Sequence, residues 1–354
     1  MFSKRITMRD VAKRLGVSHT TVAMALRNHH TISLKRREQV RHMAEKMGYR
    51  PDPFLSSLAA YRKHASPMKV QGAVAWINHW SQPKDLRQKR EYEAGIWLGA
   101  SRAADRFGYR LDDIHWSADC SAKRFEQILL TRGVRGVLIP PHNQIPDWGG
   151  LDWNKFSIVR FGLSVPYPDS NLVTVDHFRA IVLAVQRISE YGYKRIGFVV
   201  GGTYNSRLGG SNIGGFLSAA DMLKLKPILP PLNSDYGNHS VVEMTAQKSA
   251  LKKWLLKHTP DAILTTDAEI PGMLRELGYQ IPKDIAVAGT TVHDIPVDAG
   301  IEQHSEAVGR IAMETLAKQM NINECGEPTD PTRILVEARW QDGKSLPRRS
   351  PQAR

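Results

Sequence analysis

The sequence predicts an α/β protein with a three-helix N-terminal head, a hinge helix, and a two-lobed core built from doubly wound parallel sheets. Three observations lead to this fold class. Residues 7–28 contain two short amphipathic helices joined by a glycine turn, and from residue 70 apolar strands alternate with amphipathic helices. This alternation occurs in two series of similar length. A repeated order of strand and helix calls for parallel sheets covered on both faces.

The first two helices form a helix-turn-helix pattern. Thr7 and Asp10 have the S/T-x-x-D/E spacing of a capping box, Ser18 can cap the second helix, and Gly16 lies in the turn. Each helix has an apolar face: Val11, Ala12 and Leu15 in the first, and Val22, Ala25 and Leu26 in the second. A pair of this kind is suited to placing its second helix in a DNA major groove.

A third helix and a linker follow. The helix begins after Ser33, a suitable N-cap, and ends at Gly48. Pro51 and Pro53 then break the chain, and the segment FLSSLAAYRKH after them offers a short helix that is too small to be stable alone. We expect this segment to fold when it is held against another surface.

The core is expected to contain two series of strands and helices. The first series has strands at 70–77, 109–116, 136–140 and 157–162 and helices at 91–107 and 122–132. The second has strands at 172–176, 195–202, 261–267 and 285–289 and helices at 178–191, 215–223 and 271–277. The Gly-rich stretch before residue 215 is expected to be a loop. Ligands of such folds bind beyond the carboxyl ends of the strands, here in a cleft between the two lobes.

These elements define the expected domains. They are a helix-turn-helix DNA-binding domain at 1–50, a hinge helix and linker at 51–68, a core at 69–345 and a disordered tail at 346–354. Within the core, the N-lobe is expected at about 69–162 and 293–325 and the C-lobe at about 163–292 and 326–345. The tail prediction rests on the polar, basic, Pro-containing composition of the last twelve residues, 343–354.

Basic charge is concentrated in the head and linker. The 354-residue chain has a net charge of +14, of which the first 64 residues, with 14 Lys and Arg against 4 Asp and Glu, carry +10. Such an asymmetry is typical of a surface that binds the phosphate backbone of nucleic acid. The alternative is an ordinary solvated basic surface.

The two cysteines, Cys120 and Cys325, lie too far apart in the sequence for a CxxC pair. We expect them to be reduced thiols. The chain opens with no secretory signal, and no segment approaches the about 18 apolar residues of a membrane span. A cytoplasmic protein without a membrane partner is therefore expected.

Several motifs resemble those of one protein family. They are TMRDVAKRLGVSHTTVAMALRN in the head, GYRPDPFLSSLA in the linker, and YGYKRIGFVVGG, DAILTTD and ELGYQIPKDIAVAG in the core. Over nearly its whole length the sequence resembles the lactose/galactose repressor (LacI/GalR) family of bacterial transcription regulators. The resemblance implies a periplasmic-binding-protein-like core, a homodimer, a palindromic operator and a small effector that changes DNA affinity.

The sequence also departs from the family pattern. The usual Gly-x-Asp-Asp after the last signature strand is replaced by the segment 289–292, GTTV, and the usual arginine of the second lobe is Asn212. The hinge carries Asp52 and Leu55 where Asn and Ala are common. The DNA-binding role therefore transfers better than the identity of the effector.

The resemblance assigns DNA-binding residues. His19, Thr20 and Met24 match base-contacting positions, and the residues placed for phosphates are Arg9, Ser18, Thr21, Asn28 and Thr31. Leu58 is expected to act as an apolar wedge in a minor-groove step, with Leu55 and Ala59 beside it. The alternative for Leu58 is packing against the core.

The effector site is assigned from the ends of core strands, from the Gly-rich loop that contains Arg207 and Asn212, and, for Gln303, from a position that the resemblance implies. The candidates are Asn78, His79, Trp80, Asp176, Arg207, Asn212, Tyr236, Asp267 and Gln303. Carboxylate, amide and guanidinium groups with an aromatic face suit a hydroxyl-rich ligand such as a sugar, because each hydroxyl both donates and accepts hydrogen bonds. Each candidate is as readily explained as a structural loop residue.

We therefore expect a DNA-binding repressor controlled by a small polar effector, with no enzymatic activity, cofactor or metal. The chain contains neither a P-loop, nor a dinucleotide fingerprint, nor a G-x-S-x-G elbow, and His29-His30 lacks metal-ligand spacing. These absences disfavour a kinase, a dehydrogenase or a hydrolase. The remaining alternative is a sugar-binding protein without a DNA role, which would have no basic head.

Overall fold

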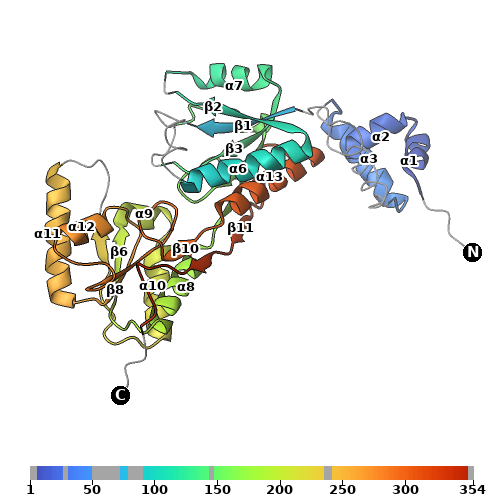
Figure 1. Cartoon of the computed structure of the whole chain (residues 1–354). Helices are drawn as coiled ribbons and strands as arrows, with labels where there is room; N and C mark the ends of the chain where they lie inside the picture. The colour runs from blue at the N-terminus through green and yellow to red at the C-terminus, as the bar shows by residue number, and fades with distance from the viewer. Residues whose placement is uncertain are drawn as a thin grey trace, which may run out of the picture.

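The computed structural model describes residues 6–26, 31–49, 72–78, 91–117, 119–142, 147–234 and 241–349. It has the predicted α/β architecture, with a three-helix head followed by two sheet-containing lobes (Figure 1). No helix in these ranges is long and apolar enough to cross a membrane.

The head consists of α1 (Met8–Leu15), α2 (His19–Leu26) and α3 (Leu34–Lys46). The predicted capping box is confirmed, since Asp10 N donates to Thr7 Oγ1 at 3.4 Å and Thr7 N donates to Asp10 Oδ2 at 2.8 Å. Gly16 ends α1 with a φ of +63°, a left-handed conformation that glycine adopts without strain. The apolar faces meet in a small core of Val11, Ala12, Val22, Ala25, Val40 and Ala44.

The N-lobe contains a six-stranded parallel sheet in the order β11-β5-β4-β3-β1-β2. Its strands are β1 (Gly72–Asn78), β2 (Tyr109–His115), β3 (Val134–Ile139), β4 (Ser157–Phe161), β5 (Asn171–Val175) and β11 (Arg333–Val336). Its helices are α6 (Glu91–Phe107), α7 (Ala122–Thr131), the short 3-10 helix η1 (Trp153–Lys155) and α13 (Ser305–Ile322). The core between sheet and helices is apolar.

The C-lobe contains a second six-stranded sheet in the order β12-β10-β9-β8-β6-β7. Its strands are β6 (Ile196–Gly201), β7 (Leu232–Ser234), β8 (Ala262–Thr265), β9 (Ala286–Gly289), β10 (Gly300–Glu302) and β12 (Arg339–Gln341). Its helices are α8 (His177–Glu190), α9 (Gly202–Arg207), α10 (Ser211–Met222), α11 (Val241–His258) and α12 (Ile270–Glu276). The edge strand β12 is antiparallel to β10, so this sheet is not wholly parallel as predicted.

The chain crosses between the lobes later than the sequence predicted. Strand β5 belongs to the N-lobe sheet, β10 to the C-lobe sheet and β11 again to the N-lobe sheet. The crossings therefore follow β5, β10 and β11 and lie near residues 176, 303 and 337, instead of 162, 292 and 325. Each predicted boundary assigned the last strand of one lobe to the other lobe, because a strand's sequence does not indicate which sheet it joins.

Helices α6 and α13 cross very closely in the N-lobe (Figure 1). A Cβ added to Gly99 would lie 2.0 Å from Glu306 O, and one added to Gly309 would lie 1.9 Å from Ile96 O. Only glycine, which has no Cβ, leaves room for the two helix backbones to pack this closely. Helix α13 was not predicted, although it is one of the two longest helices in the described ranges.

The predicted disordered tail is wrong for the residues up to 349. Leu346 is fully buried, Tyr193 Oη donates to Pro347 O at 2.9 Å, and Arg349 N donates to Tyr191 O at 2.9 Å. The Arg349 guanidinium also lies 4.2 Å from the Tyr193 ring centre. The polar composition concealed one leucine and two arginines, Arg348 over Tyr191 and Arg349 over Tyr193, that attach this segment to the C-lobe. Residues 350–354 lie outside the described ranges.

Candidate nucleic-acid interface and lobe junction

The N-terminal end of α2 presents polar side chains to solvent. His19 and Thr20 are exposed in its first turn, and Met24 is partly exposed one turn later. Ser18 caps the helix, because its Oγ accepts from Thr21 N at 3.0 Å and lies 2.8 Å from Thr21 Oγ1. Two exposed hydrogen-bonding side chains followed by an apolar one can contact base edges and a thymine methyl.

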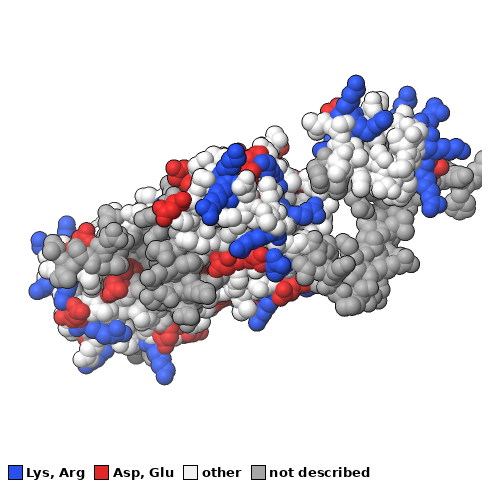
Figure 2. Space-filling view, turned by 90° about the horizontal axis from the view of Figure 1, so that it is seen from above, with Lys and Arg blue, Asp and Glu red and all other residues white. Residues whose placement is uncertain are grey.

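The candidate phosphate-contacting residues come from all three helical segments of the head. Arg9 and Thr31 are exposed, and Thr31 Oγ1 lies 3.9 Å from Met24 Sδ, which places the start of the α3 segment beside α2. Lys and Arg side chains gather on the surface of the head, with few acidic side chains among them (Figure 2). The predicted contacts Asn28, Leu55, Leu58 and Ala59 lie outside the described residues.

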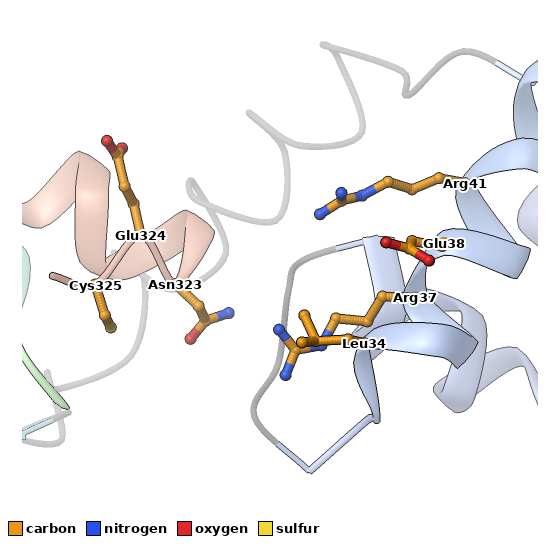
Figure 3. A pocket seen from close by; sticks show the side chains of 7 residues that line it. All are labelled: Leu34, Arg37, Glu38, Arg41, Asn323, Glu324 and Cys325. Atoms are coloured by element: carbon orange, nitrogen blue, oxygen red, sulfur yellow. The ribbon is translucent and has the colours of Figure 1, made fainter. Parts of the chain in front are cut away.

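An open gap of about 300 Å³ separates α3 from the turn after α13 (Figure 3). Its lining residues are Leu34, Arg37, Glu38, Arg41, Asn323, Glu324 and Cys325. These side chains are mostly charged or polar, whereas small-molecule sites are enclosed and mainly apolar. We assign no ligand to this gap.

The lobe junction is the region where the N-lobe and the C-lobe meet. On the C-lobe side it is formed by the carboxyl ends of β8 and β9. Asp267 follows β8, is 9% exposed, and accepts from Glu269 N at 2.8 Å. Gln303, at the second crossing, is 5% exposed and donates through Nε2 to Thr290 O at 2.9 Å. The structure thus brings Asp267 and Gln303 to the same edge of the sheet. Thr290, directly before the two departures from the family pattern at 291 and 292, contributes its carbonyl there.

The N-lobe side is formed by the ends of β1 and β3. Asn78 is 4% exposed at the end of β1, and His142 is 3% exposed in the segment after β3. Arg207 of α9 reaches this segment from the C-lobe, and its Nη1 donates to His142 O at 3.4 Å. The prediction that Arg207 and Asn212 lie in a loop is wrong. Residues 202–207 form helix α9, and Asn212 is buried on helix α10.

Asp176 and His177 lie at the first crossing. Asp176 is the N-cap of α8, and its Oδ1 accepts from Arg179 N at 2.9 Å, so this candidate has a structural task. The neighbouring His177 imidazole lies 3.4 Å from Thr174 Oγ1, and burial lowers its pKa to about 4, with the Asp176 carboxylate opposing the shift. His177 is therefore neutral at pH 7. His79, Trp80 and Tyr236 lie outside the described residues.

Sequence reasoning missed two tyrosines at the junction. Burial raises the pKa of Tyr92 on α6, and so do the nearby Tyr204 hydroxyl of α9 and the Asp294 carboxylate, which both belong to the C-lobe. The start of a helix that follows the first strand faces the ligand side of a doubly wound sheet. That rule could have identified Tyr92, but nothing in the sequence pairs it with Tyr204.

A shallow groove of about 610 Å³ lies on the C-lobe, next to the segment after β9. Its apolar lining residues are Ile281, Pro282, Val292, Ile295, Pro296 and Val297, and its polar ones are Arg275, His293, Asp298, Lys344 and Ser345. A combination of apolar and charged lining residues is typical of a surface that contacts another protein.

Comparison with known proteins identifies the family. Residues 7–52 match the description "Bacterial regulatory proteins, lacI family". The chain is also 31% identical over 139 residues to the maltose regulon regulatory protein MalI of Vibrio furnissii, covering 39% of this chain and 88% of that protein. The chain belongs to the LacI family. It is therefore a DNA-binding transcriptional regulator, as the resemblance implied, and not an enzyme.

Other LacI-family similarities extend over the core. Residues 185–346 match a periplasmic binding protein-like domain. The chain is 25% identical to the HTH-type transcriptional regulator CelR of Thermobifida fusca, over 94% of this chain and 96% of that protein. Among solved structures, a transcriptional regulator CelR–cellobiose complex is similar with a TM-score of 0.59 and 21% identity, covering 96% of this chain and 100% of that one. The predicted periplasmic-binding-protein-like fold is confirmed.

Proposed function

We propose that this LacI-family regulator is a repressor that binds a palindromic operator as a homodimer and responds to a small sugar. The observation that carries the proposal is the capped helix-turn-helix, with His19 and Thr20 exposed at the start of α2, in a segment whose first 64 residues carry a charge of +10. The fixed geometry of the helix-turn-helix allows α2 to contact DNA bases, and the positive charge of the segment supplies affinity for DNA phosphates.

Within this head, His19, Thr20 and Met24 would contact bases. The residues that would contact DNA phosphates are Arg9, Ser18, Thr21, Asn28 and Thr31. Ser18 and Thr21 would exchange the hydrogen bond between their hydroxyls for hydrogen bonds to the DNA backbone. Leu58, flanked by Leu55 and Ala59, would open a central minor-groove step, with each protomer of the dimer contributing one Leu58 side chain. Changing a base contact is expected to cost about 1–3 kcal/mol and to change the preferred operator.

The homodimer is supported by the apolar groove on the C-lobe. A groove lined by Pro296 and Val297, with Arg275 and Asp298 among its polar residues, suits a second copy of the same surface, because opposite charges can pair across a twofold axis. Two heads held by one dimer would contact two half-sites, which makes a palindrome the natural target. Sedimentation of a Pro296→Asp variant, at an exposed position of the groove, tests this surface, because the variant is expected to be monomeric.

The sugar effector is supported by the lobe junction and by the relatives. Asn78, Asp267 and Gln303 bring amide and carboxylate groups to the facing edges of the two sheets. The similar CelR structure is a complex with cellobiose, and the similar MalI is named for a maltose regulon. Because Asn212, Thr291 and Val292 replace charged groups of the family pattern, we expect a neutral sugar held mainly by amides and hydroxyls.

The DNA-binding part of the proposal is tested by salt dependence. Binding to an operator selected from random palindromes should weaken with salt, with log K falling by about 0.9 per neutralised phosphate for each unit of log salt. A triple change at His19, Thr20 and Met24 should alter the selected operator and leave non-specific binding intact. Selection of the same operator by this variant would contradict the base-contact assignment.

The effector part is tested by calorimetry with a panel of mono- and disaccharides. Asp267→Asn should weaken the binding of a positive sugar at least tenfold, and the matched change Asp284→Asn, at the far end of β9, should not. If Asp267→Asn binds with unchanged affinity, the sugar does not occupy the junction.

Leu58→Ala should reduce the bend of the bound operator, measured by energy transfer between the DNA ends.

A further inference from the structure

Helix α9 of the C-lobe interacts with the N-lobe through two side chains. Arg207 Nη1 donates to the carbonyl oxygen of His142, which follows β3, at 3.4 Å. Tyr204, one turn earlier and 43% exposed, lies close enough to Tyr92 of α6 to influence its ionisation. The Arg207 hydrogen bond and the proximity of Tyr204 to Tyr92 each join segments that belong to different lobes.

The helix itself is attached to the C-lobe. Gly201 N, at its start, donates to Thr266 Oγ1 at 3.0 Å, and Asn205 Oδ1 accepts from Ile213 N of α10 at 3.1 Å. Leu208, directly after it, is buried. Because α9 is held to its own lobe at both ends, a contact between α9 and the N-lobe is a contact between the lobes as bodies.

The chemistry at Tyr92 suits a hydrogen bond across the junction. Burial, the Tyr204 hydroxyl, Asp294 and Glu93 all raise its pKa, in that order of importance, so Tyr92 keeps its proton at neutral pH. A protonated phenol can donate to the Tyr204 oxygen or to the Asp294 carboxylate, both of which the C-lobe supplies. The acceptor of Arg207 is a backbone carbonyl, which no side-chain substitution removes.

We propose that α9 is an interlobe latch, in which Tyr204 with Tyr92, and Arg207 with the His142 carbonyl, hold the lobes together in the absence of effector. The latch gives the closed arrangement a population that does not depend on a ligand. Its effect on DNA affinity rests on the proposed function, since only a regulator that couples lobe closure to operator binding would show it. The latch itself is a property of the core and can be measured without DNA.

The test measures the distance between the lobes in the full-length protein. Spin labels are attached to Cys325, exposed in the N-lobe, and to a cysteine introduced by Leu256→Cys, a position 66% exposed on α11, with Cys120→Ser removing the other thiol. In effector-free protein, Tyr204→Phe and Arg207→Gln should each lower the ratio of closed to open distances by about two- to tenfold, the equivalent of one net hydrogen bond. The double variant Tyr92→Phe with Tyr204→Phe should open the lobes no further than either single change.

Tyr279→Phe is the matched control, because it removes a hydroxyl from the turn after α12, at the end of the C-lobe sheet opposite the junction. Unchanged distance distributions in Tyr204→Phe and Arg207→Gln would overturn the latch. A shift of equal size in Tyr279→Phe would overturn it as well, since it would show a general loosening of the core. A parent protein that fails to bind any operator would refute the proposed function and leave the distance measurement unaffected.

Discussion

Gly309→Ala tests whether the close crossing of α6 and α13 holds the N-lobe together. The new methyl group would lie 1.9 Å from Ile96 O and 2.9 Å from Ala100 N, both backbone atoms of α6. Ordinary contacts begin near 3.4 Å, so the helices must separate by about 1.5 Å. A backbone atom cannot move aside as a flexible side chain can, and the separation loosens packing along the whole crossing.

Two opposing contributions set the expected magnitude. Replacing glycine by alanine inside a helix stabilises by about 0.5–1 kcal/mol, whereas inserting a methyl group into a tightly packed site costs about 1–3 kcal/mol and sometimes more. Since the obstacle is backbone, we expect the upper end of this cost. The free energy of unfolding should therefore fall by about 2 kcal/mol.

The assay is urea unfolding of the full chain, followed by circular dichroism and by tryptophan fluorescence. Trp97 of α6 packs edge-on against Trp76 at 5.3 Å between ring centres, so fluorescence reports on this lobe. Gly272→Ala is the matched control, because a Cβ there meets nothing within 4 Å and lies in helix α12. The control should be as stable as the parent or slightly more stable. If Gly309→Ala is equally stable, the crossing has slack and the reasoning fails.

Three further predictions concern stability. Thr7→Ala should destabilise the head by about 1 kcal/mol through loss of the α1 cap, measured by amide hydrogen exchange in α1, with no change in the core. Burial lowers the pKa of His177 to about 4 from an unfolded value of 6.5, so the unfolded state takes up the proton first as the pH falls. The free energy of unfolding should therefore fall by about 2 kcal/mol between pH 7 and pH 5. His177→Gln should lose this part of the pH dependence, and a pH profile identical to that of the parent would contradict the prediction. Leu346→Ala should cost about 2–5 kcal/mol in thermal unfolding, while Leu256→Ala, at a 66% exposed site, should stay within about 0.5 kcal/mol of the parent.

Local features of the fold were predictable because local chemistry determines them. The Thr7 and Asp10 capping box, the glycine turn at Gly16 and the helix over 91–107 all follow from short-range patterns, and the structure has each of them. Long-range features were not. Strand β5 has the same apolar pattern as the C-lobe strands, so only its pairing with β4 and β11 assigns it to the N-lobe.

The candidate site was partly predictable for the same reason. Asp267 was expected at a strand end and Gln303 at a crossover position that the family resemblance implies, and the structure brings both to one edge of the C-lobe sheet. Asp176 was chosen by the same logic, yet its carboxylate caps α8. Arg207 was assigned to a ligand, and its guanidinium contacts the other lobe. A strand-end position indicates where a side chain lies, but its hydrogen-bond partner depends on segments remote in sequence.

The second crossing links the lobe junction to the crossing of α6 and α13. Gln303 contacts the C-lobe at Thr290 O, and α13 begins two residues later, with His304 held in a left-handed conformation (φ +51°) between them. Ser305 and Glu306, the first residues of α13, lie where a Cβ on Gly95 or Gly99 of α6 would overlap them. A rotation of the C-lobe therefore reaches α6 through the short Ser305 side chain and the Glu306 backbone, which lie directly against its glycines. Packed backbone transmits such a displacement instead of absorbing it, so α6 must move with α13 or the crossing must open.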